Sequence, residues 1–255
     1  MNIAGRDASK ILRAFVQRQH YVAAATMMKD AQHPVRFLSN YVLGGGEYPQ
    51  ITVVRTPTGP VCLKLWCHDD LLTVNEIFFR GDYRSGPKDK VFVDFGSNIG
   101  ISAAYFLSRS RDSFAYLFEP LPQNVVRLKE NLAPFEGRYR VEQVAVGPSE
   151  GEFEFGWEET GRYGGLGRQT GKYMRVRCRD AKDIVDEVLA RHGRIDVLKI
   201  DIETLEEEVV GRVAASAAQI RTVFVEYKFR GNPLAATHRS SQYGSVCQFF
   251  QARHA

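Results

Sequence analysis

The chain has 255 residues, of which 44% are hydrophobic and 11% aromatic, and this composition suffices for a sizeable buried core. Its 34 basic and 30 acidic residues give a net charge of +4, spread along the chain, which does not indicate a nucleic-acid partner. We expect no membrane span, because no apolar run approaches the roughly 18 to 20 residues that one requires. The first residues lack the apolar core of a signal peptide, so a cytoplasmic protein is expected.

Three N-terminal segments precede the main part of the chain. Residues 1–45 are expected to form one or two helices, which end at the glycine run 44–46. Residues 50–66 alternate apolar and polar side chains around the turn 57–60, which predicts a β-hairpin that extends or covers a sheet edge. Residues 69–83 have near-helical apolar spacing and are expected to form a helix that roofs the site that follows. The apolar face expected for the first helix consists of Ile11, Leu12, Phe15 and Val16.

The stretch from Val91 to Gly100 is the centre of the sequence-based interpretation. A β-branched and aromatic run meets Asp94, Gly96 and Gly100 follow four residues apart, and a helical pattern begins at once. This order is typical of a buried strand that turns tightly into a helix. Glycine permits the positive φ angles and the close backbone approach that a bound cofactor needs, and the helix offers its positive end. The turn therefore predicts a cofactor site.

Strand and helix patterns alternate after this turn. Strands are predicted at 114–118 and 140–146, with helices before and between them, which indicates a doubly wound, mostly parallel sheet of the α/β class. Between residues 147 and 180 the alternation stops, and two extended arms flank the loop 157–171, which contains five glycines. We interpret this loop as a substrate-side flap, with a disordered tip as the alternative.

The regular pattern resumes in the last third of the chain. Helices are predicted at 181–191 and 205–218, and strands at 196–202 and 222–227. A final helix is predicted at 240–250. We expect one domain, in which residues 1–85 form a cap, hairpin and lead-in helix and residues 86–255 form the cofactor-binding part of the same structural unit.

The residues around the glycine turn discriminate between two cofactors. A dinucleotide-binding turn has a middle glycine that touches the pyrophosphate, whereas Asn98 takes that position here. The carboxylate of Asp94 would repel a pyrophosphate but suits a ligand with an ammonium group. Glu119 follows the second strand, where an acid can accept both ribose hydroxyls. S-adenosylmethionine (SAM) fits both carboxylates, and NAD fits only Glu119.

Six short motifs extend this local interpretation along the chain. They are V-D-F-G-S-N-I-G from Val93, F-E-P from Phe118, E-N-L from Glu130, V-A-V-G from Val144, D-V-L-K-I-D-I-E from Asp196 and V-E-Y from Val225. In this order and spacing they resemble the motifs of the FkbM family of SAM-dependent methyltransferases, over about residues 71–227. The resemblance implies a Rossmann-like class I methyltransferase fold and O-methylation of a hydroxyl on a sugar or natural product.

The resemblance also implies which residues contact SAM. They are Asp94, Gly96, Ser97, Asn98 and Gly100 on the methionine and ribose side, Glu119 with Pro120 at the ribose, Gln143, Val144 and Ala145 near the adenine, and Asp201 facing the sulfonium and the acceptor.

The chain departs from the family pattern in two places. Thr204 stands where the family usually has glycine after the acidic pair, and it either changes how the backbone approaches the substrate or begins the next helix as an N-cap. The usual sheet of this fold ends in an antiparallel strand pair, but few residues remain after the helix expected at 240–250. Either the hairpin at 50–66 supplies edge strands instead, or the sheet is short.

Methyl transfer to a hydroxyl requires donor and acceptor to be held in line, and a general base increases the rate by ~10²-fold or more. Asp201 is the first candidate for this base, with Glu203, Glu226 and His238 in reserve. Three of them have a structural alternative: a buried ion pair with Lys199 for Asp201, a helix cap for Glu203 and a surface position for His238. Convergence of Asp201, Glu203 and Glu226 would allow a divalent metal, which we do not favour.

The sequence thus favours a small-molecule O-methyltransferase. One alternative is a methyltransferase that acts on a macromolecule, for which we find neither an Asn/Asp-Pro-Pro-aromatic motif nor a basic groove. The other is a non-catalytic module, either NAD-binding or a methyltransferase relic. Asn98 argues against the NAD-binding form, and the intact Asp94 and Glu119 argue against the relic. A homo-oligomer is compatible with the sequence.

Overall fold

The computed structural model describes residues 2–3, 6–7, 18–158 and 164–251. The chain divides into two compact units, residues 1–84 and 85–255, and each is described by itself. The sequence-based division into 1–85 and 86–255 within one structural unit stays a prediction. The apolar face expected at residues 11–16 lies outside the described residues.

The first unit combines short helices with one β-hairpin. Its elements are β1 (Asn2–Ile3), β2 (Arg6–Asp7), α2 (Arg18–Asp30), α3 (Pro34–Leu43), β3 (Gln50–Thr56), β4 (Gly59–Leu65), α4 (His68–Val74) and the π-helix η1 (Asn75–Arg80). Helix α3 ends where Gly44 takes a φ of +67°, which confirms the expected glycine stop. Strands β3 and β4 pair antiparallel, which confirms the hairpin. They form a two-stranded sheet of their own, so the expectation that they extend another sheet is wrong.

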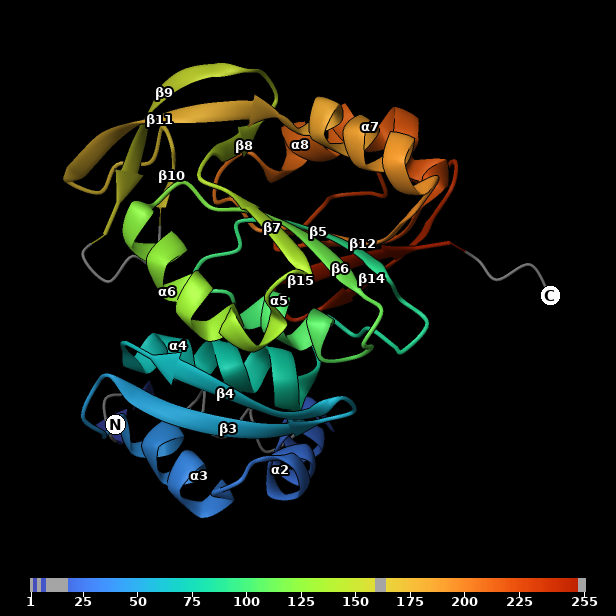
Figure 1. Cartoon of the computed structure of the whole chain (residues 1–255). Coiled ribbons are helices and arrows are strands. Elements are labelled where there is room, and N and C mark those ends of the chain that lie inside the picture. The colour runs from blue at the N-terminus through green and yellow to red at the C-terminus, as the bar shows by residue number, and fades with distance from the viewer. Residues whose placement is uncertain (1, 4–5, 8–17, 159–163, 252–255) are drawn as a thin grey trace. The chain divides into compact units, whose positions relative to one another are not determined.

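The second unit is built on a seven-stranded sheet (Figure 1). Its strands and helices are β5 (Val91–Phe95), α5 (Ile101–Leu107), β6 (Phe114–Phe118), α6 (Pro122–Leu132), η2 (Ala133–Phe135), β7 (Tyr139–Glu142), β8 (Ala145–Gly147), β9 (Gly151–Trp157), β10 (Gly164–Leu166), β11 (Lys172–Asp180), α7 (Ala181–His192), β12 (Ile195–Ile200), α8 (Glu206–Val213), η3 (Ala214–Gln219), β13 (Ile220–Val225), β14 (Arg239–Tyr243) and β15 (Val246–Phe250). The strand order is β14-β15-β13-β12-β5-β6-β7, and the five strands from β13 to β7 are parallel. The Rossmann-like class I fold is thereby confirmed.

The strand order reverses between β5 and β12. From β5 the chain proceeds through β6 to β7 on one side, and later through β12 to β13 on the other. In open α/β sheets, ligands bind beyond the carboxyl ends of the strands at such a switch point. The glycine turn that follows β5 is therefore placed where a ligand is expected.

Helices cover both faces of the sheet (Figure 1). Strand β5 alternates between the faces, because successive side chains of a strand point in opposite directions. On one face Phe92 stacks on Phe106 of α5, with ring centroids 4.7 Å apart. On the other face Val93 joins a core that includes Ile184 of α7 and Val209 of α8. Full burial of β5 explains its continuous apolar run.

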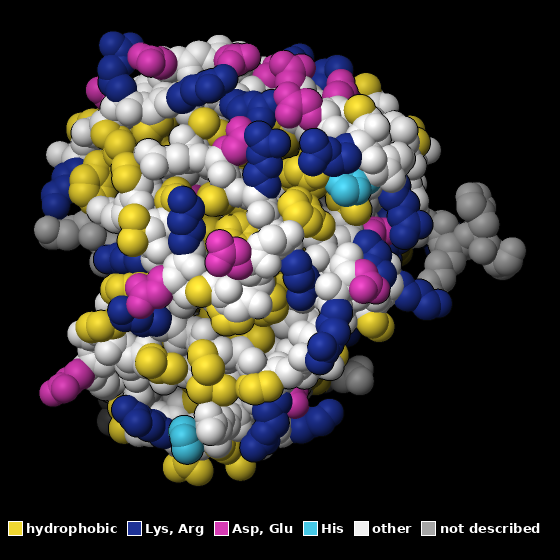
Figure 2. Space-filling model, in the orientation of Figure 1, with side chains coloured by type: hydrophobic (Ala, Val, Ile, Leu, Met, Phe, Trp, Pro, Cys, Tyr) yellow, Lys and Arg dark blue, Asp and Glu magenta, His cyan; other side chains and the backbone are white. Residues whose placement is uncertain are grey.

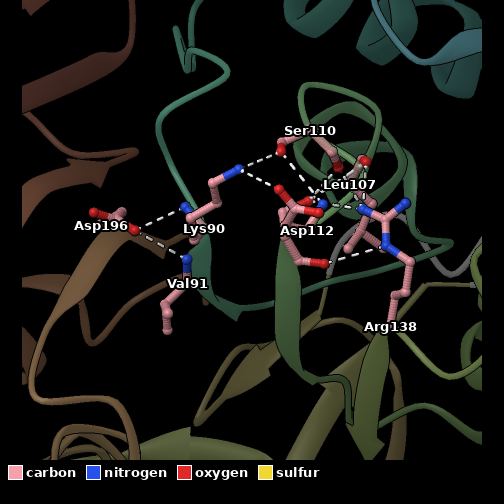
Figure 3. Close-up of polar contacts among 8 residues, drawn as sticks. Lys90, Val91, Leu107, Ser110, Asp112, Arg138 and Asp196 are labelled. Carbon is pink, nitrogen blue, oxygen red and sulfur yellow. Dashed lines mark hydrogen bonds and ion pairs between the residues drawn. The ribbon is translucent and has the colours of Figure 1, made fainter.

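A polar network joins β5 to its neighbours at the amino ends of the strands (Figure 3). The buried carboxylate of Asp196 accepts hydrogen bonds from the backbone N–H groups of Lys90 at 2.7 Å and Val91 at 3.1 Å. Arg138 donates to the carbonyl oxygens of Leu107 at 2.7 Å and Ser110 at 2.6 Å. These contacts fix the strand register at the edge opposite to the ligand side.

A second sheet has the order β10-β9-β11-β8. Strands β9 and β11 pair antiparallel, which confirms the two extended arms that flank the glycine-rich loop. Residues 159–163 of that loop lie outside the described residues. The prediction of a single strand at 140–146 is wrong. Strand β7 of the main sheet ends at Glu142, and the residues that follow form β8, which pairs with β11 in the second sheet.

The helix predicted at 240–250 is also wrong. The segment forms β14 and β15, which pair antiparallel around Gly244, and β15 pairs antiparallel with β13. The C-terminal segment thus completes the sheet, and neither a short sheet nor edge strands from the hairpin 50–66 are needed. Within the described residues, no helix has the length and apolarity needed to cross a lipid bilayer.

Candidate active site

A cleft opens at the carboxyl ends of β5, β6, β7 and β12, beside the switch point. Its lining residues are Gly96, Asn98, Phe118, Glu119, Pro120, Leu121, Asn124, Val144, Ala145, Val146, Phe155, Gly164, Leu166, Asp201, Ile202, Glu203 and Leu205. The lining combines three carboxylates, those of Glu119, Asp201 and Glu203, with apolar walls, which is typical of a small-molecule site.

The turn after β5 forms the floor of this cleft. Gly96 has a φ of +84°, and a Cβ built on it would lie 1.8 Å from the carbonyl oxygen of Asp201. Only glycine therefore allows the ends of β5 and β12 to lie this close. Asn98 takes a φ of +47°, a conformation that asparagine tolerates better than most residues, and this explains how the turn functions without the middle glycine.

Glu119 lies at the end of β6 and is buried in the cleft wall. Its Oε2 accepts a hydrogen bond from the Asn98 N–H at 2.9 Å, and its Oε1 accepts from the Leu121 N–H at 3.0 Å and from Asn124 Nδ2 at 3.2 Å. Burial raises the pKa of Glu119 to about 7, although these hydrogen bonds and the charge of Lys199 oppose the rise. The sequence analysis does not identify Leu121 or Asn124 as partners of Glu119. The side-chain amide of Asn124, five residues after Glu119, is the sequence signal that could have identified one of them.

Lys199 of β12 and two carboxylates form a buried ion cluster behind the cleft. Lys199 Nζ lies 3.1 Å from Asp94 Oδ1 and 3.2 Å from Asp201 Oδ2, and it donates to the Gly96 carbonyl oxygen at 3.0 Å. Asp94 is fully buried, and its Oδ2 accepts from Ser102 Oγ at 2.5 Å. The ammonium contact expected of Asp94 is therefore wrong, because its carboxylate faces Lys199 and Ser102. Asp201 is the member of the cluster that lines the cleft.

The turn after β12 holds an unusual backbone conformation. Glu203 and Thr204 have φ angles of +56° and +94°, in the region that favours glycine, and this explains why a glycine would be suited to the position of Thr204. Helix α8 begins after Leu205, which takes the N-cap position without a side-chain hydrogen bond, so neither the N-cap expected for Thr204 nor the cap expected for Glu203 is observed. Instead, Glu203 pairs with Arg168, and Thr204 Oγ1 donates to the Leu166 carbonyl oxygen at 2.9 Å.

The remaining wall of the cleft is apolar. Val144 and Ala145 line it, as expected for the adenine side, whereas Gln143 is exposed and does not belong to the lining. Phe155 of β9 and Leu166 of β10 complete this wall. We did not predict these two residues, because their place in the cleft depends on how the second sheet packs beside the first.

Two further residues implied by the resemblance, Ser97 and Gly100, and the reserve candidate for the base, Glu226, lie outside the cleft lining. Ser97 is buried and donates from Oγ to the Asp94 carbonyl oxygen at 2.9 Å, which holds the turn together. Gly100 allows close packing of α5 on α6, because a Cβ there would lie 3.1 Å from Leu128 Cγ. Glu226 follows β13 and is exposed. These side chains support or flank the site.

His238 is neither a surface residue nor a neighbour of the cleft. It is 4% exposed, and its Nε2 donates to the Ile220 carbonyl oxygen at 2.8 Å, at the amino end of β13. Its Nδ1 lies 2.8 Å from Thr237 Oγ1. Parallel strands place this end of the sheet opposite to the cleft, so His238 is a structural residue.

Metal binding by the acidic residues of the site has no support in the described part of the chain. There, the structure contains no group of three or more His, Cys, Asp or Glu side chains that could hold a metal ion. Asp201 contacts Lys199, and Glu203 contacts Arg168. Both carboxylates are thus used by cationic side chains.

The donor set of the cleft fits SAM. One carboxylate, Glu119, is placed to accept a ribose hydroxyl, apolar residues provide a surface for a base, and a second carboxylate, Asp201, complements a cationic group. The arrangement can therefore bind a nucleoside that carries a positively charged side arm.

Comparison with known proteins is consistent with this chemistry. A model of the FkbM methyltransferase domain matches residues 94–254. The AMB antimetabolite synthetase AmbE of Pseudomonas aeruginosa is 29% identical over 174 residues, which are 66% of this chain and 8% of that protein. The 2-O-methyltransferase NoeI of Sinorhizobium fredii is 24% identical over 155 residues, covering 54% of this chain and 63% of NoeI. The match thus spans less than two thirds of either relative.

Among solved structures, a methyltransferase from Geobacter sulfurreducens aligns with 65% of this chain and 72% of its own, at 12% identity and a TM-score of 0.39.

Proposed function

Because the chain belongs to the FkbM methyltransferase family, we propose that it transfers a methyl group from SAM to a hydroxyl oxygen of a small molecule, a sugar or a natural product. The observation that carries this proposal is the presence of Glu119 and Asp201 in one cleft at the switch point of the sheet. The name of NoeI, a 2-O-methyltransferase, supports oxygen as the methyl acceptor.

The residues of the cleft have distinct roles in this proposal. Bound SAM supplies an electrophilic methyl group. Glu119 accepts a ribose hydroxyl, and the apolar side chains of Phe155 and Leu166 exclude water from the reacting groups. Asp201 accepts the proton of the acceptor hydroxyl as general base. Glu203 and Glu226 stay in reserve for this role.

A small acceptor is favoured over a nucleic acid by the distribution of charge. On the face drawn in Figure 2, Lys and Arg side chains are interspersed with acidic, apolar and uncharged ones. A nucleic-acid surface instead gathers basic residues along one face. The net charge of +4 points in the same direction.

The first test is binding of S-adenosylhomocysteine, measured by isothermal titration calorimetry. We expect a dissociation constant in the micromolar range for the wild type and about tenfold or weaker binding for Glu119→Gln, because a charge-assisted hydrogen bond contributes ≈ 1.5–3 kcal/mol. The Glu226→Gln variant, which removes an exposed carboxylate outside the cleft lining, serves as the matched control. Absence of any binding by the wild type would refute a SAM-dependent activity.

The second test identifies the acceptor. Transfer of radiolabelled methyl from SAM is measured with nitrophenyl glycosides, flavonoids, bulk tRNA and denatured casein. Label on a hydroxyl of a glycoside or flavonoid supports the proposal, and label on tRNA or casein overturns it in favour of a macromolecular acceptor. Asp201→Asn is expected to lower kcat about 10²-fold or more.

A further inference from the structure

Lys199 is a lysine buried within a parallel sheet. Its side chain is 3% exposed, and it lies between the carboxylate of Asp94 on the neighbouring strand and that of Asp201 at the edge of the cleft. Lysine is almost never fully buried unless it is paired. Asp201 directly follows the last residue of β12, Ile200, and lies two residues after Lys199, which brings the two side chains into contact at the end of the strand.

The cluster carries a net charge of −1, because one ammonium group faces two carboxylates. Burial alone would lower the pKa of Lys199, but the charges of Asp201 and Asp94 outweigh it and raise this pKa. Lys199 therefore stays charged. Asp94 is fully buried, whereas the side chain of Asp201 is 29% exposed, so the uncompensated negative charge belongs to the cleft side of the cluster.

The two carboxylates differ in how their oxygens are used. Both oxygens of Asp94 have protein partners, Lys199 Nζ and Ser102 Oγ. Asp201 contacts Lys199 through Oδ2 at 3.2 Å, and the same residue lines the cleft. Lys199 thus holds one oxygen of Asp201 and leaves Oδ1 as the oxygen for a ligand.

The other charged groups near Asp201 do not replace Lys199. Glu206 of α8 is buried, and both burial and the charge of Asp201 raise its pKa. Glu203 pairs with Arg168, which follows β10. Within residues 18–158 and 164–251, Lys199 is therefore the cation that contacts Asp201 directly.

We propose that Lys199 is a positioning residue for methyl transfer: it orients the Asp201 carboxylate toward the acceptor and separates it from the neighbouring carboxylate of Asp94. This inference rests on the proposed role of Asp201 as general base. The geometry carries it, because the same ammonium group also holds the Gly96 carbonyl oxygen of the cofactor turn at 3.0 Å. One side chain thereby fixes the proton acceptor relative to the floor of the donor site.

A purely structural role makes a different prediction. If Lys199 only stabilises the sheet, its replacement lowers the free energy of unfolding and reduces kcat equally at every pH. If it positions Asp201, its replacement leaves the carboxyl groups of Asp94 and Asp201 close together without a cation between them, and two such acids compete for one proton. The pH dependence of Asp201 then changes as well.

The test follows the carboxyl signal of Asp201 by NMR in protein labelled with ¹³C at the aspartate carboxyl groups, with Asp201→Asn for assignment. In Lys199→Met, which preserves side-chain length, we expect the signal to change at a pH at least one unit higher than in the wild type. Lys199→Arg should largely restore the wild-type pH. Lys90→Met is the control, because it removes a lysine at the opposite end of the strands, where Nζ contacts Ser110 and Asp112.

Two further variants protect the test against loss of folding. The double variant Asp94→Asn with Lys199→Met removes both buried charges, and we expect its Asp201 signal to return toward the wild-type pH. Asp94→Asn alone keeps Lys199, and we expect its Asp201 signal to change at a lower pH than in the wild type. Unchanged titration of Asp201 in Lys199→Met, or in Asp94→Asn if the former does not fold, overturns the proposal.

Activity separates this inference from the proposed function. With the acceptor that the panel identifies, Lys199→Met should lower kcat at least tenfold, shift the acidic limb of the pH profile upward and leave KM for SAM within about threefold. If the wild type fails to bind S-adenosylhomocysteine, the proposed function fails while the NMR result stands. If Asp201→Asn keeps full activity, the role of Lys199 in catalysis is refuted together with that of Asp201.

Discussion

Glu119 should make cofactor binding depend on pH in a way that the structure determines. A carboxylate offers about four acceptor positions, and three of them are taken by the N–H groups of Asn98, Leu121 and Asn124. The remaining position is on Oε2. A proton on Glu119 and a ribose hydroxyl of the ligand therefore compete for the same lone pair.

The magnitude follows from the pKa of about 7 that burial gives Glu119. At pH 6 about one in eleven of these carboxyls is ionised, and at pH 8 about ten in eleven. Since the apparent dissociation constant is the intrinsic one divided by the competent fraction, affinity should weaken about tenfold from pH 8 to pH 6, or ~1.4 kcal/mol.

The assay is calorimetric titration with S-adenosylhomocysteine between pH 5.5 and 8.5. Glu119→Gln does not titrate, so its dissociation constant should be weaker than that of the wild type and nearly constant over this range. The amino group of the ligand also titrates, and it affects the dissociation constants of the wild type and of Glu119→Gln alike. Subtracting the Glu119→Gln profile from the wild-type profile therefore leaves the contribution of Glu119. A wild-type affinity that stays constant across pH 7, or a Glu119→Gln profile parallel to the wild type, would refute the competition between proton and ribose.

The raised pKa of Glu119 has the opposite consequence for stability: a rise in pH should strengthen ligand binding but lower the free energy of unfolding. Because the pKa of the folded state lies above the usual value of 4.5, the unfolded chain loses this proton first as the pH rises. The contribution of Glu119 to the free energy of unfolding therefore falls between about pH 4.5 and 7, by up to ~3 kcal/mol. Glu119→Gln should lack this decrease in urea titrations.

Three further variants test the backbone and the core. Gly96→Ala should lower the free energy of unfolding by several kcal/mol and abolish ligand binding. Gly193 also has a positive φ but no atom within 4 Å of an added Cβ, so Gly193→Ala should lower the free energy of unfolding by only ~1 kcal/mol. Equal losses of the two variants in urea denaturation would contradict the close approach of the Asp201 backbone to Gly96. Thr204→Gly should raise Tm by about 2–4 °C through relief of its φ of +94°, and a lower Tm would show that the bond from its hydroxyl outweighs the strain. Burial lowers the pKa of His238, so its contribution to stability is complete above about pH 6.5 and is lost as the pH falls toward the pKa of the folded state. In thermal unfolding between pH 7 and 5, His238→Gln should therefore show a smaller decrease of Tm with falling pH than the wild type. An equal decrease in both proteins would exclude His238 as the source of the pH dependence.

Local periodicity was sufficient for the elements that surround the donor side. The strand at 114–118 has the predicted bounds, and the helix predicted at 181–191 is α7, because alternation and helical spacing are properties of neighbouring residues. The order of strand ends then places Gly96, Glu119 and Asp201 together without knowledge of side-chain contacts.

The errors arise where distant segments decide the structure. Val246–Phe250 is a short apolar run that fits a helix or a strand, and its pairing with β13 selects the strand. Gly244, with a φ of +62°, was the local signal for the hairpin. Asp94 was assigned to the ligand because the sequence does not show that Lys199, 105 residues later, takes its carboxylate.

The residues of the cleft come from widely separated parts of the chain, and this has a consequence for folding. Asp94 and Lys199, which are 105 residues apart, meet where β12 pairs with β5, and β6, β7 and the second sheet lie between them in the sequence. Closing so long a loop costs more chain entropy than a local contact does, and folds rich in such contacts fold slowly. Gly96 and Asp201 of the cleft follow β5 and β12, so binding of the methyl donor requires these two strands to be paired. A fragment of the chain that ends before β12 should therefore have no measurable affinity for the donor.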